Sequence, residues 1–277
     1  EAVKEIAAEI KLDKGEKAGT ANIFGEQQVK MDVRSNQIVE EKLVQTMVVG
    51  LIASEEMDEE LKICDGPYAV AHDPLDGSSL IDVNLAVGSI FGIYRTETFY
   101  GRMGDDQVGA VLGVYGPRTA LFLTVREGVA YFVFDGNQFV LEHERLVIKK
   151  EGKMFAPGNL RAAAKRKDYL ELVNYWTVNE YKLRYSGGMV PDIGQILLKG
   201  YGIFTYPGYV DQPDGKLRVL YECAPMALII EDAGGKAVDC KGRRILELEV
   251  TDLAQRTPIL IGSKLEVELA EKHLNEL

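Results

Sequence analysis

The chain has 277 residues, of which 46% are hydrophobic and 27% are charged. This length can bury one large core or two medium-sized ones, and the composition is that of an ordinary soluble globular protein. The formal net charge of -11, with no basic patch to offset it, argues against a nucleic-acid-binding surface. A negative chain can still bind a phosphate if carboxylate-bound metal ions reverse the local charge.

Cysteine usage and apolar runs predict where the protein works. The three cysteines Cys64, Cys223 and Cys240 form neither a zinc pattern nor a disulfide framework, which is typical of a reducing cytoplasm. No apolar run approaches the ~20 residues of a membrane span. The residues after Glu1 do not resemble a charged-then-apolar leader. We therefore expect a cytoplasmic protein with no membrane partner.

The first half of the chain is predicted to form helices and then a sheet. Apolar residues at helical spacing predict a helix over residues 2–10, and charge with Gly and Ala predicts a loop over 12–21. A long amphipathic helix, with a break near Ser35, is expected over 27–49. Short apolar or alternating runs then predict strands at residues 50–53, 68–71, 83–94, 109–119, 121–125, 130–134 and 139–141.

The second half alternates helical and extended patterns. A charged connector over residues 147–153 predicts a domain boundary between residues 1–148 and residues 149–277. The expected elements are helices at 168–180, 189–199 and 265–274, strands at 202–206 and 258–261, and a run over 217–231 that changes from strand to helix after Pro225. Such alternation predicts a layered α/β fold.

One stretch carries the clearest chemical signal. Residues 73–79 read DPLDGSS and follow a short apolar strand, and their proline and glycine turn the chain toward a helix start at Ser78. Asp73 and Asp76 can point into one volume with the Leu75 carbonyl, which suits a hard cation such as Mg²⁺. Gly77 leaves room for an anion beside the first amides of the helix. Taken alone, Asp-x-x-Asp-Gly is more often an acidic, serine-capped turn with a structural role only.

The full string resembles the signature of the lithium-sensitive, metal-dependent sugar phosphatases, which include inositol monophosphatase, fructose-1,6-bisphosphatase and sedoheptulose-1,7-bisphosphatase. Segments 27–36, 184–192 (RYSGGMVPD) and 215–227 (GKLRVLYECAPMA) also resemble the bisphosphatases, in the family's order. The likeness extends over about residues 2–274. It implies an αβαβα sandwich and Mg²⁺-dependent hydrolysis of the 1-phosphate of a sugar bisphosphate, in gluconeogenesis or the reductive pentose phosphate pathway.

The resemblance also implies roles for residues whose patterns alone indicate solvated corners or helix faces. It makes Asp32 and Glu56 the groups that orient and deprotonate the attacking water. The implied ligands of two or three Mg²⁺ ions, with Mn²⁺ as an alternative, are Glu55, Asp73, Leu75, Asp76 and Glu222. The implied substrate-binding residues are Asp76, Gly77, Ser78, Ser79, Asn159, Arg161, Arg184, Tyr185, Tyr206 and Lys216.

Substrate, assembly and regulation are less sharply implied. Segments 113–119, 155–161 and 187–192 are closer to sedoheptulose bisphosphatase, so both sugars stay open. An arginine matching Arg184 reaches a neighbouring subunit's site in the fructose enzymes, which implies a homodimer or homotetramer. The late start of the chain relative to the AMP-binding arm, and the lack of paired cysteines at 18–21, lead us to expect neither AMP nor thiol control.

The sequence favours four other functions less. An inositol-monophosphatase-like enzyme would not need Arg184, Lys216 and Tyr206 for a second phosphate, and a non-catalytic sugar-phosphate sensor would not need every metal carboxylate. A nucleotide phosphate loop or a serine hydrolase elbow is not found in the sequence. The three histidines are scattered, and His72 either tunes its neighbour Asp73 or simply packs.

Overall fold

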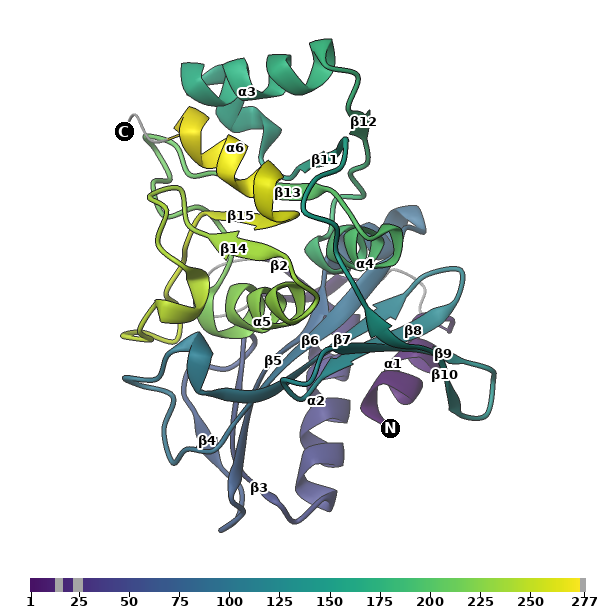
Figure 1. The fold of residues 1–277 in the computed structure, drawn as a ribbon. Helices are drawn as coiled ribbons and strands as arrows, with labels where there is room; N and C mark the ends of the chain where they lie inside the picture. The colour runs from purple at the N-terminus through teal and green to yellow at the C-terminus, as the bar shows by residue number, and fades with distance from the viewer. Residues whose placement is uncertain (13–16, 22–26, 275–277) are drawn as a thin grey trace.

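Helices and sheets alternate in five layers (Figure 1), in a computed structural model that describes residues 1–12, 17–21 and 27–274. Among the described residues the α-helices are α1 (Ala2–Ile10), α2 (Lys30–Gln45), α3 (Lys167–Val178), α4 (Met189–Lys199), α5 (Ala224–Asp232) and α6 (Lys264–Leu274). Helices α1 and α2 cover the outer face of a large sheet, α4 and α5 lie between the two sheets, and α3 and α6 cover the second sheet. The predicted αβαβα sandwich is confirmed.

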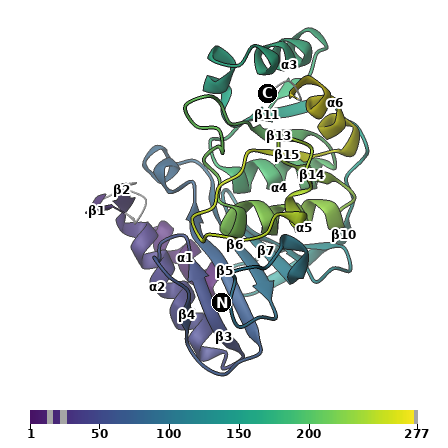
Figure 2. The same cartoon turned by 90° about the vertical axis from the view of Figure 1, so that its left-hand side faces the viewer.

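The large sheet has the strand order β10-β9-β8-β7-β6-β5-β3-β4, and the smaller one β12-β11-β13-β15-β14. A separate antiparallel pair joins β1 to β2 at the edge of the molecule (Figure 2). The strand bounds are β1 (Lys17–Ala21), β2 (Gln27–Val29), β3 (Val49–Ser54), β4 (Leu61–Lys62), β5 (Tyr68–Asp76), β6 (Val87–Tyr94), β7 (Gln107–Tyr115), β8 (Thr119–Thr124), β9 (Val129–Phe134), β10 (Phe139–Leu146), β11 (Met154–Pro157), β12 (Lys182–Leu183), β13 (Ile203–Tyr206), β14 (Lys236–Val238) and β15 (Ile259–Gly262).

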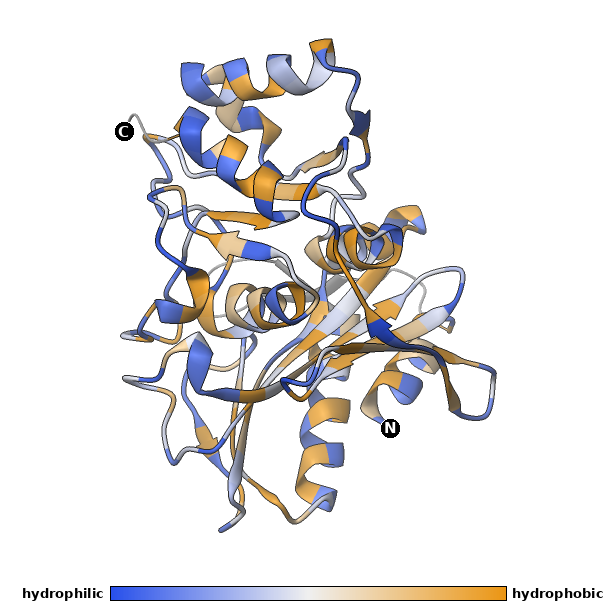
Figure 3. Ribbon diagram, in the orientation of Figure 1, coloured by the Kyte–Doolittle hydropathy of each residue, from blue (hydrophilic) through white to orange (hydrophobic). Residues whose placement is uncertain are grey.

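Burial follows from this layering. Strands β3 and β5 are buried on both faces because helices cover both sides of the sheet there. Strands β8 and β9 alternate between buried and half-buried residues, as strands with one less-covered face do. Helix α5 is buried along residues 224–230, and α4 carries hydrophobic residues around most of its circumference (Figure 3), since both lie between two sheets. Within the described ranges, no helix is long and apolar enough to cross a bilayer.

Most predicted elements exist, with two differences near the N-terminus. Residues 17–21, expected to be loop, form β1, whereas the neighbouring 13–16 lie outside the described residues. Residues 27–29, expected to be helical, pair with β1 instead, so α2 begins at Lys30. It runs unbroken past Ser35 and ends at Gln45, two residues before Met47 adopts a left-handed φ of 58°. Pairing with another strand therefore outweighs the helical pattern of 27–29.

Two further corrections concern β5 and the residues that precede α5. The strand expected over 68–71 continues to Asp76, because β5 stays paired with β6 across a register shift between Asp73 and Asp76. Pro74 falls in that irregularity, where no ladder N–H is required. Residues 217–221, expected to be a strand, instead lead into a wide helical turn, η4 (Val219–Cys223), that continues into α5. The run is buried on all sides, so periodicity alone cannot distinguish strand from helix there.

Candidate active site

Acidic residues lie side by side on two neighbouring parallel strands of the large sheet, β3 and β5, at the level where β3 ends. Residue Ser54 of β3 is paired with His72 of β5, and the next backbone N–H along, that of Glu55, donates to the His72 carbonyl oxygen (3.1 Å). The pair Glu55 and Glu56 therefore follows β3 at the position where Asp73 stands in β5. Ligands commonly bind at such carboxyl ends of parallel strands, because the chain leaves the sheet there in the same direction.

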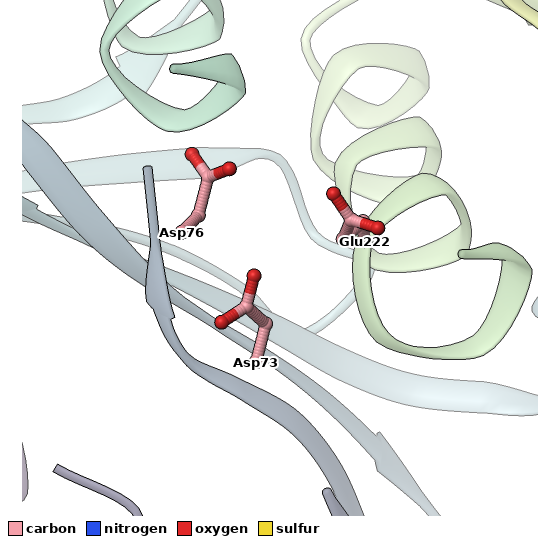
Figure 4. A group of neighbouring side chains, drawn as sticks. All are labelled: Asp73, Asp76 and Glu222. Atoms are coloured by element: carbon pink, nitrogen blue, oxygen red, sulfur yellow. The ribbon is translucent and has the colours of Figure 1, made fainter. Parts of the chain in front are cut away.

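Three carboxylates converge at this point from two elements (Figure 4). Asp73 and Asp76 come from β5, and Glu222 comes from η4 across the layer boundary. One ligand oxygen from each lies within 4.8 Å of the others. The exposed fractions of the three residues are 4%, 9% and 6%. Three buried carboxylates at this separation form a compact set of oxygen donors of the kind that hard divalent cations prefer.

Backbone amides hold one oxygen of each carboxylate. Asp73 Oδ1 accepts from the Leu75 N–H (2.8 Å), and Asp76 Oδ2 accepts from the Val190 N–H at the start of α4 (2.8 Å). In the same way Glu222 Oε2 accepts from the Arg218 N–H (2.5 Å) that precedes its turn. The wide turn of η4 thus places and orients Glu222. Such π-type turns occur frequently at functional sites.

The electrostatics of this cluster favour a cation. Burial, followed by the charge of Glu55, raises the pKa of Asp73 and of Glu222 well above the ordinary carboxyl value. Burial likewise raises the pKa of Asp76 to about 6, although the N–H of Val190 and the charge of Lys216 lower it. Such shifts mean that the carboxylates repel one another and lack solvent. A divalent cation would remove both penalties, so the residues present fit a metal site.

Two cations border the cluster. Arg218, whose side chain is 1% exposed, places Nε 3.7 Å from Glu55 Oε1. The charge of Lys216 lowers the pKa of both Asp76 and Glu222. Next to the carboxylates, burial lowers the pKa of His72 to about 3, so this imidazole is neutral. Arg218 is therefore paired with Glu55, and Lys216 is the positive charge that acts on Asp76 and Glu222.

A cavity of about 420 Å³ opens over the cluster. It is lined by most of the predicted site residues, which come from α2, the ends of β3 and β5, η1 (Ser78–Val83), β13 and η4. These are Asp32, Glu55, Glu56, Asp73, Leu75, Asp76, Gly77, Ser78, Ser79, Tyr185, Tyr206, Lys216 and Glu222. A larger cavity of about 600 Å³ lies between α1 and residues 81–86, but Asp82 is the single carboxylate among its lining residues. The smaller cavity therefore contains the clustered carboxylates that a metal-binding site needs.

Comparison with known proteins identifies the family. The profile described as "Fructose-1-6-bisphosphatase, N-terminal domain" matches residues 1–144, and that described as "Fructose-1-6-bisphosphatase, C-terminal domain" matches residues 148–275. The chain belongs to the fructose-1,6-bisphosphatase family. This confirms the resemblance inferred from the motifs at 73–79, 184–192 and 215–227. The family consists of metal-dependent phosphatases, and the acidic cluster agrees with that chemistry.

Individual relatives carry two names. The class 1 fructose-1,6-bisphosphatase of Geobacter metallireducens is 46% identical over 254 residues, which are 90% of this chain and 80% of that protein. The chloroplastic sedoheptulose-1,7-bisphosphatase of Triticum aestivum is 38% identical over 99% of this chain and 70% of its own length. The solved holo form of Leishmania major fructose-1,6-bisphosphatase has a TM-score of 0.92 at 39% identity, covering 98% of this chain and 90% of that one. A putative sedoheptulose-1,7 bisphosphatase from Toxoplasma gondii has a TM-score of 0.93 at 31% identity, covering 99% and 90%.

The turn that follows Asp76 depends on glycine. Gly77 adopts a left-handed φ of 78° between β5 and the 3-10 helix η1. A Cβ at Gly77 would meet Leu80 Cδ1 at 3.3 Å and the Gly188 Cα at 3.5 Å. The helix predicted to start at Ser78 exists, but as a six-residue 3-10 helix. Glycine is therefore needed at position 77 for the left-handed turn, whereas the neighbouring atoms lie near ordinary contact distance from a Cβ.

Three predicted substrate residues do not line the cavity. Asn159 is 3% exposed, and its Nδ2 donates to the Pro207 carbonyl oxygen (2.9 Å). Arg161 is exposed, but its charge lowers the pKa of Tyr206, which places it near the rim. Arg184 is exposed, and its backbone N–H donates to Phe155. Substrate contacts by these three residues stay predictions.

Sequence reasoning also missed residues that border the cavity. Gly187, Gly188 and Met189 bring the start of α4 against Asp76, and the paired glycines were a signal for that approach. Phe204 and Leu217 add apolar walls. These two gave no signal, because an apolar residue in a strand or buried run looks the same whether it faces a core or a ligand.

Proposed function

We propose that the protein hydrolyses the 1-phosphate of a sugar bisphosphate, either fructose 1,6-bisphosphate or sedoheptulose 1,7-bisphosphate, with Mg²⁺ as its metal. The observation that carries this proposal is the convergence of Asp73, Asp76 and Glu222 in a cavity that also contains Tyr206 and Lys216. Carboxylates on one side and phosphate-binding groups on the other are what a substrate with two phosphates requires.

The metal would be held by the acidic end of the cavity. Asp73, Asp76, Glu222 and Glu55, with the Leu75 carbonyl, are the proposed ligands of two or three Mg²⁺ or Mn²⁺ ions. Bound cations would supply charge neutralisation for the phosphate and stabilisation for the leaving oxygen. The chain's own contribution is to fix the carboxylates, through the three backbone N–H bonds to Asp73, Asp76 and Glu222.

The water and its proton are assigned to the two remaining acids. Asp32, 6% exposed in the first turn of α2, and Glu56, directly after β3, line the same cavity as the ligands. We assign to them the orientation of the attacking water and the acceptance of its proton. Gly77 and the backbone amides of Ser78 and Ser79, at the start of η1, would donate to the oxygens of the phosphate being transferred.

The other phosphate and the sugar would occupy the Tyr206 side of the cavity. Lys216 supplies a point charge, and Tyr206 a hydroxyl donor on a rigid ring. Tyr185 lines the same wall, where its hydroxyl donates to the Gly158 carbonyl oxygen (2.9 Å). Arg161 lies close enough to affect Tyr206. Arg184 is proposed to serve the site of a second copy, which would make the protein a homodimer or homotetramer.

One assay tests this function. Phosphate release should require Mg²⁺ and should be at least about tenfold faster, as kcat/KM, with a sugar bisphosphate than with inositol 1-phosphate, because a monophosphate leaves Lys216 and Tyr206 unused. Fructose 1,6-bisphosphate and sedoheptulose 1,7-bisphosphate should be compared side by side, since relatives with both names match. Metal-independent release, or preference for the monophosphate, would contradict the proposal. The cytoplasmic location and the boundary at residue 148 stay predictions.

A further inference from the structure

His72 is a buried polar residue to which the proposed mechanism gives no role. It immediately precedes Asp73 in β5 and is fully buried. Its ring stacks on Phe91 of β6, with 6.2 Å between centroids and 22° between planes. Its Nδ1 has no hydrogen-bond partner among the described residues. A buried polar atom without a partner lowers the stability of the fold, so packing alone would favour an apolar aromatic ring at this position.

The other ring nitrogen connects β5 to α2. His72 Nε2 lies 3.1 Å from Asn36 Oδ1. The amide of Asn36 is oriented from its other side, because Nδ2 donates to Glu40 Oε1 (2.5 Å). Oδ1 can then act only as an acceptor, so Nε2 of His72 carries the proton and donates it. The bond has a fixed direction and runs from the sheet to the helix.

Asn36 stands one helical turn after Asp32. Residues four apart on a helix share a face, so the bond to His72 holds the face of α2 from which Asp32 enters the cavity. The buried apolar residues of α2, Ile38 and Val39, pack in the same core as Val70 and Phe91. Such contacts are non-directional and tolerate sliding or rotation of the helix. A directional bond does not.

We propose that His72 is a positioning residue, which acts through Asn36 to fix the place of Asp32 relative to the acidic cluster. The inference rests on the proposed function, in which Asp32 helps to orient and deprotonate the water. It explains why a polar ring with one unpaired nitrogen occupies a fully buried position. Misplacement of a catalytic group by about 1 Å can reduce a rate up to ~100-fold, so a residue without substrate contact can matter at this position.

The test is the aromatic replacement His72→Phe in the full chain. It keeps the stacking on Phe91 and removes the donor. We expect kcat to fall about tenfold, with KM and the Mg²⁺ concentration for half-maximal activity changed less than twofold, and no loss of thermal stability. His72→Gln, which retains an N–H donor, should recover part of kcat. Tyr94→Phe is the matched control: Tyr94 is fully buried in the same sheet, its hydroxyl has no described partner, and it pairs with Ala69 at the far end of β5.

Coupling to Asn36 distinguishes positioning from loosened packing. If His72 acts through Asn36, the double variant His72→Phe/Asn36→Ala should lose no more kcat than the more impaired single variant. Amide hydrogen exchange over residues 32–36 should also become faster in His72→Phe and stay unchanged in Tyr94→Phe. Losses that multiply in the double variant, or wild-type kcat and exchange in His72→Phe, would overturn the inference. The exchange measurement does not depend on chemistry, so it decides the matter even if Asp32→Asn retains full activity and the proposed role of Asp32 fails.

Discussion

Two groups of charged side chains lie at opposite ends of the same helical segment, η4 and α5, and they differ in whether their charges balance. At the C-terminal end, Arg244 donates through Nε to Glu231 Oε2 (2.8 Å) and through a terminal nitrogen to Asp105 Oδ2 (2.5 Å). Arg126 adds a second guanidinium, 3.6 Å from Asp105. Each carboxylate there has a cation beside it, and the group joins the large sheet to α5.

At the N-terminal end the charges do not balance. Glu222 faces Asp73 and Asp76, and Glu55 is close enough to raise the pKa of Asp73 and of Glu222; the nearby cations are Arg218 and Lys216. The balanced charges at the C-terminal end are those of a group that stabilises the fold. The excess of carboxylates at the N-terminal end is that of a group that binds a cation. Buried charges are normally paired, so a persistent excess of one sign marks a functional site.

The largest expected effect is on catalysis at the unbalanced end. Asp32→Asn should reduce kcat about 10³-fold, because it removes a proton acceptor without changing the shape of the cavity. Divalent-metal binding and the thermal midpoint should change little. Steady-state kinetics and calorimetry check this, with Asp82→Asn, an exposed acid outside the cavity, as the matched control. Wild-type turnover in Asp32→Asn would remove Asp32 from the mechanism.

The next prediction concerns pH and the metal-free protein. The folded-state pKa of Asp76 is raised to about 6, and those of Asp73 and Glu222 are also raised well above the ordinary carboxyl value. Between pH 4 and these values the folded chain holds more protons than the unfolded chain, so the free energy of unfolding falls as pH rises. A carboxyl with a pKa near 6 rather than near 4 contributes about 3 kcal/mol to this loss.

Denaturant unfolding at pH 5 and pH 8, with and without Mg²⁺, measures that loss. The metal-free protein should be less stable at pH 8, and Mg²⁺ should stabilise it more at pH 8 than at pH 5. In Glu222→Gln both differences should shrink. The account would be contradicted if the stability of the metal-free protein rose steadily from pH 5 to pH 8 in both wild type and variant. That result would mean that burial and mutual repulsion do not raise the pKa values of these carboxylates.

A smaller effect is expected from changing Lys216, which we assign to substrate binding beside the acidic cluster. Lys216→Met should raise KM for a sugar bisphosphate about 10- to 100-fold, the equivalent of one charge-assisted hydrogen bond, and should change kcat less than threefold. KM for a sugar monophosphate should be nearly unaffected. Equal loss with both substrates would mean that Lys216 acts on the reacting phosphate or on the carboxylates instead.

The smallest effect is expected at the balanced end. Arg244→Ala should lower the free energy of unfolding by about 1–2 kcal/mol, because it leaves the half-buried Glu231 without a partner, and kcat/KM should stay within twofold of wild type. Arg118→Ala, which breaks the more exposed pair with Glu142, is the control and should cost less than about 0.5 kcal/mol. A loss of activity in Arg244→Ala that exceeds its loss of stability would break the comparison.

The sequence was informative where a residue's role is local. The turn at residues 73–79, with its two aspartates and its glycine, was located from composition and spacing alone, and it lies in β5 and η1 at the cavity. The helix over residues 189–199 was predicted with its observed bounds. In each case neighbours in the chain determine the conformation.

The residue patterns could not predict features of the site that depend on contacts between residues far apart in the chain. Glu222 was assigned by resemblance, and the strand expected before it is a wide helical turn, because a fully buried run has no periodicity to read. The bond from Val190 to Asp76 and that between His72 and Asn36 join residues 114 and 36 positions apart. A local sequence pattern does not predict such pairs, because the packing of whole helices and strands determines which of their residues lie opposite one another.

The most direct test of the unbalanced cluster is a calorimetric titration of the metal-free protein with Mn²⁺ or Mg²⁺ at pH 7.5, in wild type and in Asp73→Asn/Glu222→Gln. The wild-type protein should bind the cation with release of protons, since metal and proton compete for the same carboxylates. The double variant should show no binding in the same concentration range. Equal binding by the two proteins would contradict the account.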